Sequence, residues 1–84
     1  MSTKTLGNYI VADPKICHGT PTIRGTRIMV WQILEQVARE EPWDEIVTAW
    51  DGKVTKEAIA EALHLTSRTL RERGPEYLVE PAPA

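Results

Sequence analysis

The stretch that decides the fold is MVWQILEQVAREEPWDEIVTAWDGKVTKEAIAEAL, residues 29–63. Its apolar residues recur at intervals of three and four, which is the period of a helix with one buried face. The first repeat predicts a helix over residues 29–40, which Pro42 ends. The second repeat predicts a helix that starts at Pro42 and stops at the Asp-Gly pair of residues 51–52. Two short helices therefore follow each other closely.

A third helix is predicted after a connection of about four residues, an arrangement typical of a helix-turn-helix. Thr55 suits its N-cap position, and Val54 and Ile59 have the spacing of a hydrophobic staple. The Gly-Pro pair of residues 74–75 is predicted to end it. The side chains that we expect to face inward on this helix are Ala58, Ile59, Ala62, Leu63, Thr66 and Leu70.

Strand and turn signals precede the helices. Short β-prone runs lie at residues 9–11 and 22–24, with turn-forming residues between them. They predict a two-stranded β-arm over residues 8–28. The predicted fold is therefore mainly α: a three-helix domain with a helix-turn-helix and a short N-terminal two-stranded β-arm.

The domain boundaries follow from the same signals. The single domain is predicted to cover residues 8–73, with the three helices over residues 29–73. Residues 1–7 form an N-terminal segment outside it. Prolines in residues 74–84 predict a flexible tail. Eighty-four residues allow one domain of this size, because chains of this length rarely divide.

The charge balance limits the function classes. Ten Lys and Arg against twelve Asp and Glu give a formal net charge of −2, whereas a dedicated nucleic-acid-binding domain is usually strongly basic. Any contact with DNA must therefore come from a local patch. Residues 1–34 carry a net positive charge and residues 35–61 a net negative one. Two surfaces of opposite charge suggest two different partners.

Metal and catalytic sites are not indicated. Cys17 is the single cysteine, so neither an internal disulfide nor a cysteine-rich zinc site is possible. Cys17, His18 and a distant His64 are too few for a closed tetrahedral site. No nucleophile and base, or pair of acids, occurs at an informative spacing. We expect no enzyme activity, no cofactor and no metal.

The candidate DNA contacts are basic residues of the arm and of the third helix, which is the candidate reading helix. Glutamates in its N-terminal half, Glu57 and Glu61, would repel phosphate. Arg27 has an alternative role, since it can pair with Asp13 inside the chain. The DNA-contact candidates are Arg24, Arg27, Lys56, His64, Arg68 and Arg71.

Candidate protein contacts lie on the first helix and near the C-terminus. Trp31 is at the edge of the first helix's apolar stripe, and a half-exposed tryptophan favours a contact with a partner or a second copy. The unpaired edges of a two-stranded arm also invite a homodimer. The partner-contact candidates are Trp31, Arg73, Tyr77 and Leu78.

The run DPKICHGTPTIRGTRIMV, residues 13–30, resembles the signature D-P-x-I-C-x-G-x-P-x-I-x-G-T-R-I-x-V of domain-of-unknown-function family 433. This bacterial and archaeal family is regarded as VapB-like antitoxins. Every fixed position matches, and the likeness covers residues 8–65. Two departures are Met29, where the family often has proline, and the connection at residues 51–54, so the pose of the third helix is expected to differ.

The resemblance implies a homeodomain-like helical domain with a β-arm. It also implies the antitoxin of a type II toxin–antitoxin pair. Such a protein would bind and neutralise a PIN-like ribonuclease toxin and repress its own operon as a dimer. The alternative is a freestanding dimeric DNA-binding regulator, and a third possibility is a structural adaptor whose β-arms pair. We expect a cytoplasmic protein with no membrane partner, because no apolar run approaches the length of a membrane span.

Overall fold

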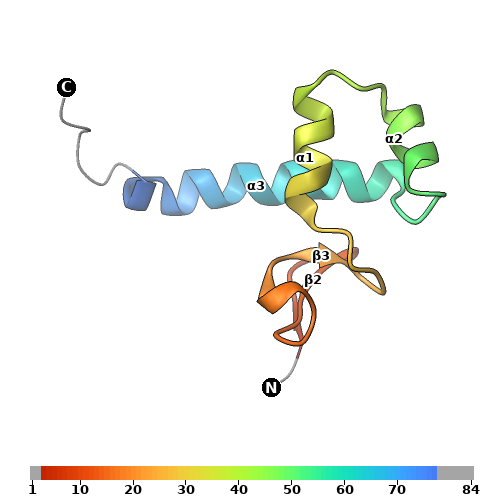
Figure 1. Ribbon diagram of the computed structural model, residues 1–84. Coiled ribbons are helices and arrows are strands. Elements are labelled where there is room, and N and C mark those ends of the chain that lie inside the picture. The colour runs from red at the N-terminus through yellow and green to blue at the C-terminus, as the bar shows by residue number, and fades with distance from the viewer. Residues whose placement is uncertain (1–2, 78–84) are drawn as a thin grey trace.

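The computed structural model describes residues 3–77, and the side chains up to residue 74. It shows three helices and a small three-stranded antiparallel sheet, so the chain is mostly helical (Figure 1). The elements in chain order are β1 (Lys4–Thr5), β2 (Ile10–Ala12), the single turn η1 (Cys17–Gly19), β3 (Thr22–Ile23), α1 (Val30–Ala38), α2 (Trp43–Ala49) and α3 (Lys56–Tyr77).

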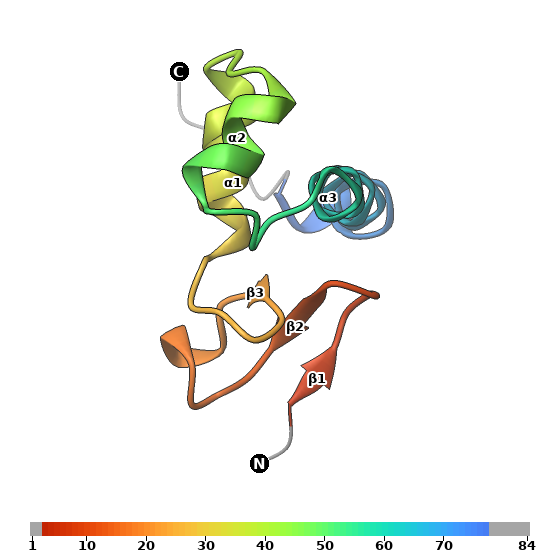
Figure 2. The same cartoon turned by 90° about the vertical axis from the view of Figure 1, so that its right-hand side faces the viewer.

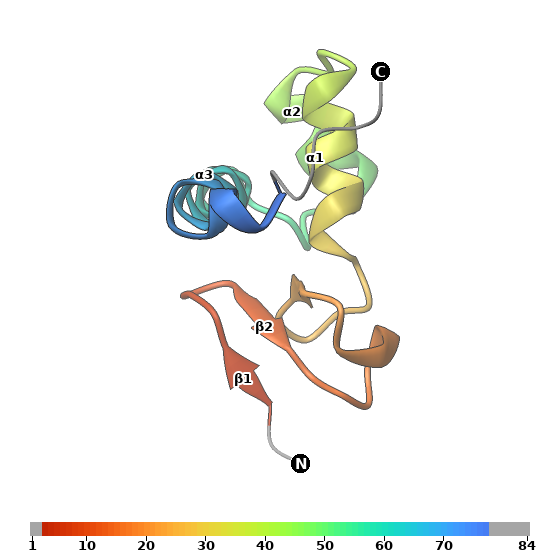
Figure 3. The same cartoon turned by 90° about the vertical axis from the view of Figure 1, so that its left-hand side faces the viewer.

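Helix α3 holds the fold together. Its N-terminal half contacts α1 and α2 on one side and β2 on the other. Figures 2 and 3 show the same arrangement from two sides, with the α1–α2 pair and the sheet lying on different sides of α3. The C-terminal half of α3 extends past α1, away from α2 (Figure 1). No helix within residues 3–77 is long and apolar enough to cross a membrane.

The core is built around one isoleucine from each main element. Ile10 of β2, Ile33 of α1 and Ile46 of α2 are fully buried, as is Ile59 of α3. Each such burial contributes about 1.5–3 kcal/mol to the free energy of unfolding. The apolar period of residues 29–63 therefore predicted the three helical isoleucines of this core, whereas Ile10 comes from the sheet.

The sheet has one strand more than the two predicted. Lys4–Thr5, which we placed outside the domain, pairs with β2 in the register Lys4↔Ala12. Both residues of β1 are exposed, so no apolar alternation marks this strand in the sequence. It is held by backbone pairing and by a turn in which the N–H groups of Leu6 and Gly7 donate to the carbonyl of Ile10, at 2.9 and 3.2 Å.

Glu61 fastens this β1–β2 hairpin to α3. Its two carboxylate oxygens accept hydrogen bonds from the backbone N–H groups of Asn8 and Tyr9, each at 2.8 Å. Gly7 lies so close to the same carboxylate that a Cβ at this position would sit 2.5 Å from Oε2 of Glu61. The prediction that Glu61 is a free acid on the outer face of the helix is therefore wrong.

The ends of the helices confirm most of the sequence signals. The hydroxyl of Thr55 accepts a hydrogen bond from the N–H of Ala58 at 3.1 Å, so Thr55 caps α3. The connection after α2 turns through Asp51 and Gly52, which have φ of 55° and 76°. A positive φ is cheap for glycine, which explains why the Asp-Gly pair ends α2.

The predicted end of α3 is wrong. The helix passes through residues 74–75 and continues to Tyr77. A glycine C-cap requires a positive φ, and Gly74 does not have one. Pro75 removes one N–H donor, which a helix tolerates more easily near its end. The predicted tail otherwise lies in residues 78–84, outside the described residues.

A side-chain network joins α1 to the end of α2. The indole N–H of Trp50 donates to Oε1 of Gln36 at 2.7 Å, and the amide of Gln36 donates to Glu41 at 3.2 Å. Arg39 pairs with the other oxygen of Glu41 at 3.0 Å. Gln36 is buried, and these bonds satisfy both ends of its amide, as a buried polar group requires.

Asp13 shapes the turn after β2. One carboxylate oxygen accepts from the N–H of Lys15 at 2.9 Å and the other from the hydroxyl of Thr3 at 3.0 Å. These bonds favour the ionised form, and the backbone bond from Lys15 contributes most to the lowered pKa of Asp13. The alternative role for Arg27, an ion pair with Asp13, is therefore not what the structure shows.

We predict that Glu61→Ala lowers the free energy of unfolding by about 1–3 kcal/mol, because two backbone N–H groups lose a charged acceptor. Urea denaturation followed by circular dichroism measures this change. The control is Glu72→Ala, an exposed residue of the same helix, for which we expect a change within about 0.5 kcal/mol. Equal effects of the two substitutions would contradict the role of Glu61.

We also predict that the protein loses stability in acid partly through Asp13. Its pKa is lowered in the folded state, so its contribution is present above the ordinary pKa of aspartate, about 3.9, and is lost as the pH falls through the folded-state pKa. Denaturation midpoints measured from about pH 5 to 2 should fall less steeply for Asp13→Asn than for the unsubstituted chain. Parallel curves for the two proteins would exclude this contribution.

Candidate functional site

Helix α3 presents two opposite faces. One face packs on the core through Ala58, Ile59 and Ala62, all of them buried. Successive residues of a helix are rotated by about 100°, so Leu65, Thr66, Thr69 and Leu70 continue this core-facing stripe into the C-terminal half. The opposite face carries His64, Arg68 and Arg71, whose side chains are all exposed.

The basic face gathers several of the predicted DNA-contact residues around the hairpin turn. A guanidinium nitrogen of Arg24 donates to the carbonyl of Gly7 at 3.4 Å. Gly7 also lines a hollow of about 210 Å³ together with His64 and Arg68 of α3. Arg71 lies about one turn further along the same face. We call Arg24, His64, Arg68 and Arg71 the basic face. Neither Arg68 nor Arg71 forms an ion pair within the described residues.

Lys56 does not extend this basic face. Its ammonium lies 2.6 Å from a carboxylate oxygen of Asp44 on α2. The hydrogen bond to Asp44 raises the pKa of Lys56, because it favours the charged amine. The charge of Lys56 is thus already paired with a carboxylate of the same chain, and an approaching phosphate would have to compete with Asp44 for it.

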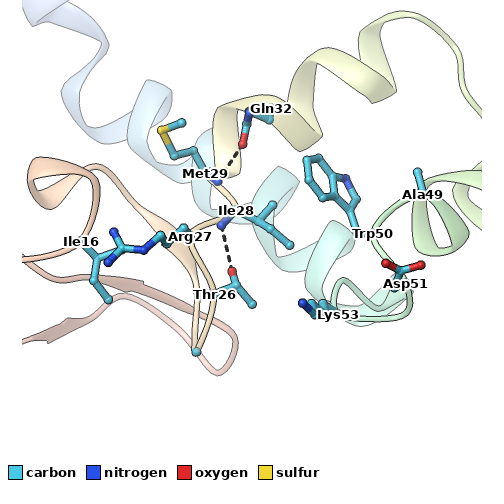
Figure 4. Close-up of a pocket in the computed structure, with 11 residues that line it drawn as sticks. Ile16, Thr26, Arg27, Ile28, Met29, Gln32, Ala49, Trp50, Asp51 and Lys53 are labelled. Atoms are coloured by element: carbon cyan, nitrogen blue, oxygen red, sulfur yellow. Dashed lines mark hydrogen bonds between the residues drawn. The ribbon is translucent and has the colours of Figure 1, made fainter.

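Arg27 lies in a separate cleft of about 790 Å³, between the β3–α1 loop and the α2–α3 connection (Figure 4). The loop is held by Thr26, whose hydroxyl donates to the carbonyl of Ile23 at 2.8 Å and accepts from the N–H of Ile28 at 3.0 Å. Figure 4 shows the Arg27 guanidinium beside Ile16, with Lys53 on the other side of the cleft. The charged groups of Arg27 and Lys53 do not point toward one another across the cleft, so they are not arranged to bind one anion together.

An apolar groove of about 410 Å³ lies beside the C-terminal half of α3, where that helix meets α1. Trp31 and Leu70 form its rim, and they are 53% and 56% exposed. The groove brings together two predicted partner-contact residues, Trp31 and Arg73. Tyr77 is in the last turn of α3, where only the backbone is described, and Leu78 lies outside the described residues.

The sequence does not predict this groove, because the apolar period of the third helix places Leu70 on the face toward the core. Leu70 lies on the core-facing stripe, but at that point α3 has passed beyond the helices that would cover it. The helix lengths explain why Leu70 is uncovered: α1 and α2 have 9 and 7 residues, and α3 has 22. Helices of this length cannot cover the whole apolar stripe of α3.

No metal centre is found in the described part of the chain. Within residues 3–77, no three His, Cys, Asp or Glu side chains are grouped to hold an ion. The thiol of Cys17 donates a weak hydrogen bond to the backbone carbonyl of Arg27, at 3.7 Å. This contact ties η1 to the β3–α1 loop and gives Cys17 a structural role.

Comparison with known proteins finds one family. A family model described as "Protein of unknown function (DUF433)" matches residues 10–65. No curated protein and no solved structure matches the chain. The matched range begins at the first residue of β2 and ends within α3, at Leu65.

Proposed function

The chain belongs to the DUF433 family, and on that premise we propose that it is a VapB-like antitoxin, which binds and neutralises a PIN-like ribonuclease toxin. The observation that supports this proposal best is the basic face of α3. Arg68 and Arg71 are exposed there and have no ion-pair partner within the described residues. A nuclease with an acidic, metal-binding site offers the carboxylates that such arginines bind.

The proposed neutralisation is steric and electrostatic. An arginine guanidinium can form two parallel hydrogen bonds with one carboxylate, and such charge-assisted contacts are stronger than neutral ones. The part of α3 beyond Leu65 has 12 residues up to Tyr77 and is about 18 Å long. A helix of this length can lay its basic face over the acidic site of a nuclease and cover it. We place this interaction in the cytoplasm, where the single cysteine stays reduced.

We predict that the double substitution Arg68→Glu and Arg71→Glu weakens binding to the nuclease encoded beside this protein by roughly 2 kcal/mol or more, because both arginines lose their carboxylate partners. Isothermal titration with the purified nuclease measures this loss. Ribonuclease activity should return in parallel, since the acidic site is uncovered.

The matched control for this experiment is Arg27→Glu. It makes the same change of charge in the separate cleft and should leave binding nearly unchanged. No binding of the unsubstituted chain to the neighbouring nuclease would reject the antitoxin proposal. Binding that survives the double substitution would leave the antitoxin proposal standing and exclude the basic face as its contact.

The second candidate function is a freestanding dimeric DNA-binding regulator, in which α1, α2 and α3 form a homeodomain-like helix-turn-helix. The grouping of Arg24, His64 and Arg68 around the hairpin turn supports this reading. The engagement of Glu61 with the hairpin supports it too, because it removes one of the two glutamates that would repel phosphate from the reading helix. An antitoxin that represses its own operon would use the same face.

For this second function we predict binding to the DNA upstream of the protein's own operon, with an affinity that falls steeply with salt. Three arginine–phosphate contacts per chain, or six in the dimer, give a slope of about −5 in log K against log salt concentration. Arg68→Gln removes one contact from each chain and should reduce that slope by about 2. Fluorescence anisotropy with a labelled duplex measures both values. A slope near zero would exclude binding through phosphates.

A further inference from the structure

The apolar groove beside α3 is not used by either proposed function, and it points to a second copy of the chain. Its rim residues Trp31 and Leu70 are both more than half exposed. Large apolar groups that gather beside one hollow usually mark an interaction surface. We propose that this groove is the contact surface of a homodimer, and that its occupant is the C-terminal half of α3 from the second copy.

The length of α3 supports a second copy as the occupant of the groove. A helical segment of about 12 residues is marginal in water when nothing packs on it. The core-facing stripe of α3 continues through Leu65 and Thr69 to Leu70, where the domain no longer covers it. A second copy carries the same uncovered stripe, so pairing the two segments covers both at once.

The face of α3 along the groove can pack on the same face of a second copy, as a twofold axis requires. Along the groove α3 carries Leu65, Thr66, Thr69 and Leu70, so its large and small side chains have the same order from either end. When two copies cross in opposite directions at this segment, Leu65 of one copy lies at the level of Leu70 of the other, and Thr66 lies at the level of Thr69. The leucines then make apolar contacts at both ends of the crossing, and the small threonines between them let the two helices approach closely.

The two threonines of this face can be buried in a contact with little loss of free energy. The hydroxyl of Thr66 donates to the carbonyl of Ala62 at 2.8 Å, and that of Thr69 donates to the carbonyl of Leu65 at 2.9 Å. Both donors are therefore satisfied within α3. Burying them against an apolar partner therefore leaves no hydroxyl donor without an acceptor. A buried donor without an acceptor is the usual source of the free-energy penalty for a polar group in such a contact.

The groove is a better dimer surface than the edge of the sheet. The β-arm pairing that the sequence suggests would use β1, which has two residues, both exposed. So short an edge offers few hydrogen bonds and no apolar area. Pairing through the groove also leaves the basic face open on the opposite side of α3. A dimer of this kind does not depend on the antitoxin proposal.

The first test is the oligomeric state of the full chain by sedimentation velocity over a range of concentrations. We expect a reversible dimer, and we expect Leu70→Gln to raise its dissociation constant by about tenfold or more. The matched control is Tyr9→Gln, which changes another exposed apolar residue outside the groove and should leave the constant unchanged. Circular dichroism confirms that each variant is folded.

A second test locates the contact by cross-linking. In a Cys17→Ala background, Thr69→Cys places a thiol in the groove and Arg71→Cys places one on the opposite face. Mild oxidation should link the Thr69→Cys chains into a covalent dimer and leave the Arg71→Cys chains largely unlinked. A chain that stays monomeric at all concentrations would overturn the proposal. A dimer that is unaffected by Leu70→Gln and links equally at both positions would overturn it too.

Discussion

The packing of four isoleucines around the first half of α3 is the constraint on which the structure depends. Each comes from a different element, and each is completely buried. Neither the sheet nor either short helix has enough apolar area to be stable alone, because strands of two or three residues and helices of 7 or 9 are marginal in water. The core exists only when α3 brings them together.

The hairpin is oriented by one carboxylate on that helix. Glu61 reaches from α3 to two adjacent backbone N–H groups of the turn between β1 and β2. This contact places Gly7 beside α3 and brings Arg24, which directly follows β3, to the same side as His64 and Arg68. A structural contact thereby assembles the basic face, which is why residues 40 positions apart in the chain share one surface.

The excess length of α3 gives this small domain two surfaces. Arg68 and Arg71 lie on one side of the helix and its uncovered apolar stripe lies on the other, so contacts on the two sides do not compete. An antitoxin that is dimeric and also binds a nuclease needs this separation. The same separation suits a dimeric regulator, in which the two basic faces approach DNA together.

The sequence by itself determined the three helices, the cap at Thr55, the turn at Gly52 and the helical part of the core, because those features rest on local periodicity and on single residues at the helix ends. It also predicted Trp31 and Arg73 as partner contacts, and the structure places both of them in one groove. Only the tertiary structure decided the third strand, the role of Glu61 and the exposure of Leu70. These depend on which segments meet in space: β1 is held by backbone pairing, Glu61 by a turn some 50 residues away in the chain, and Leu70 is uncovered because the neighbouring helices end first.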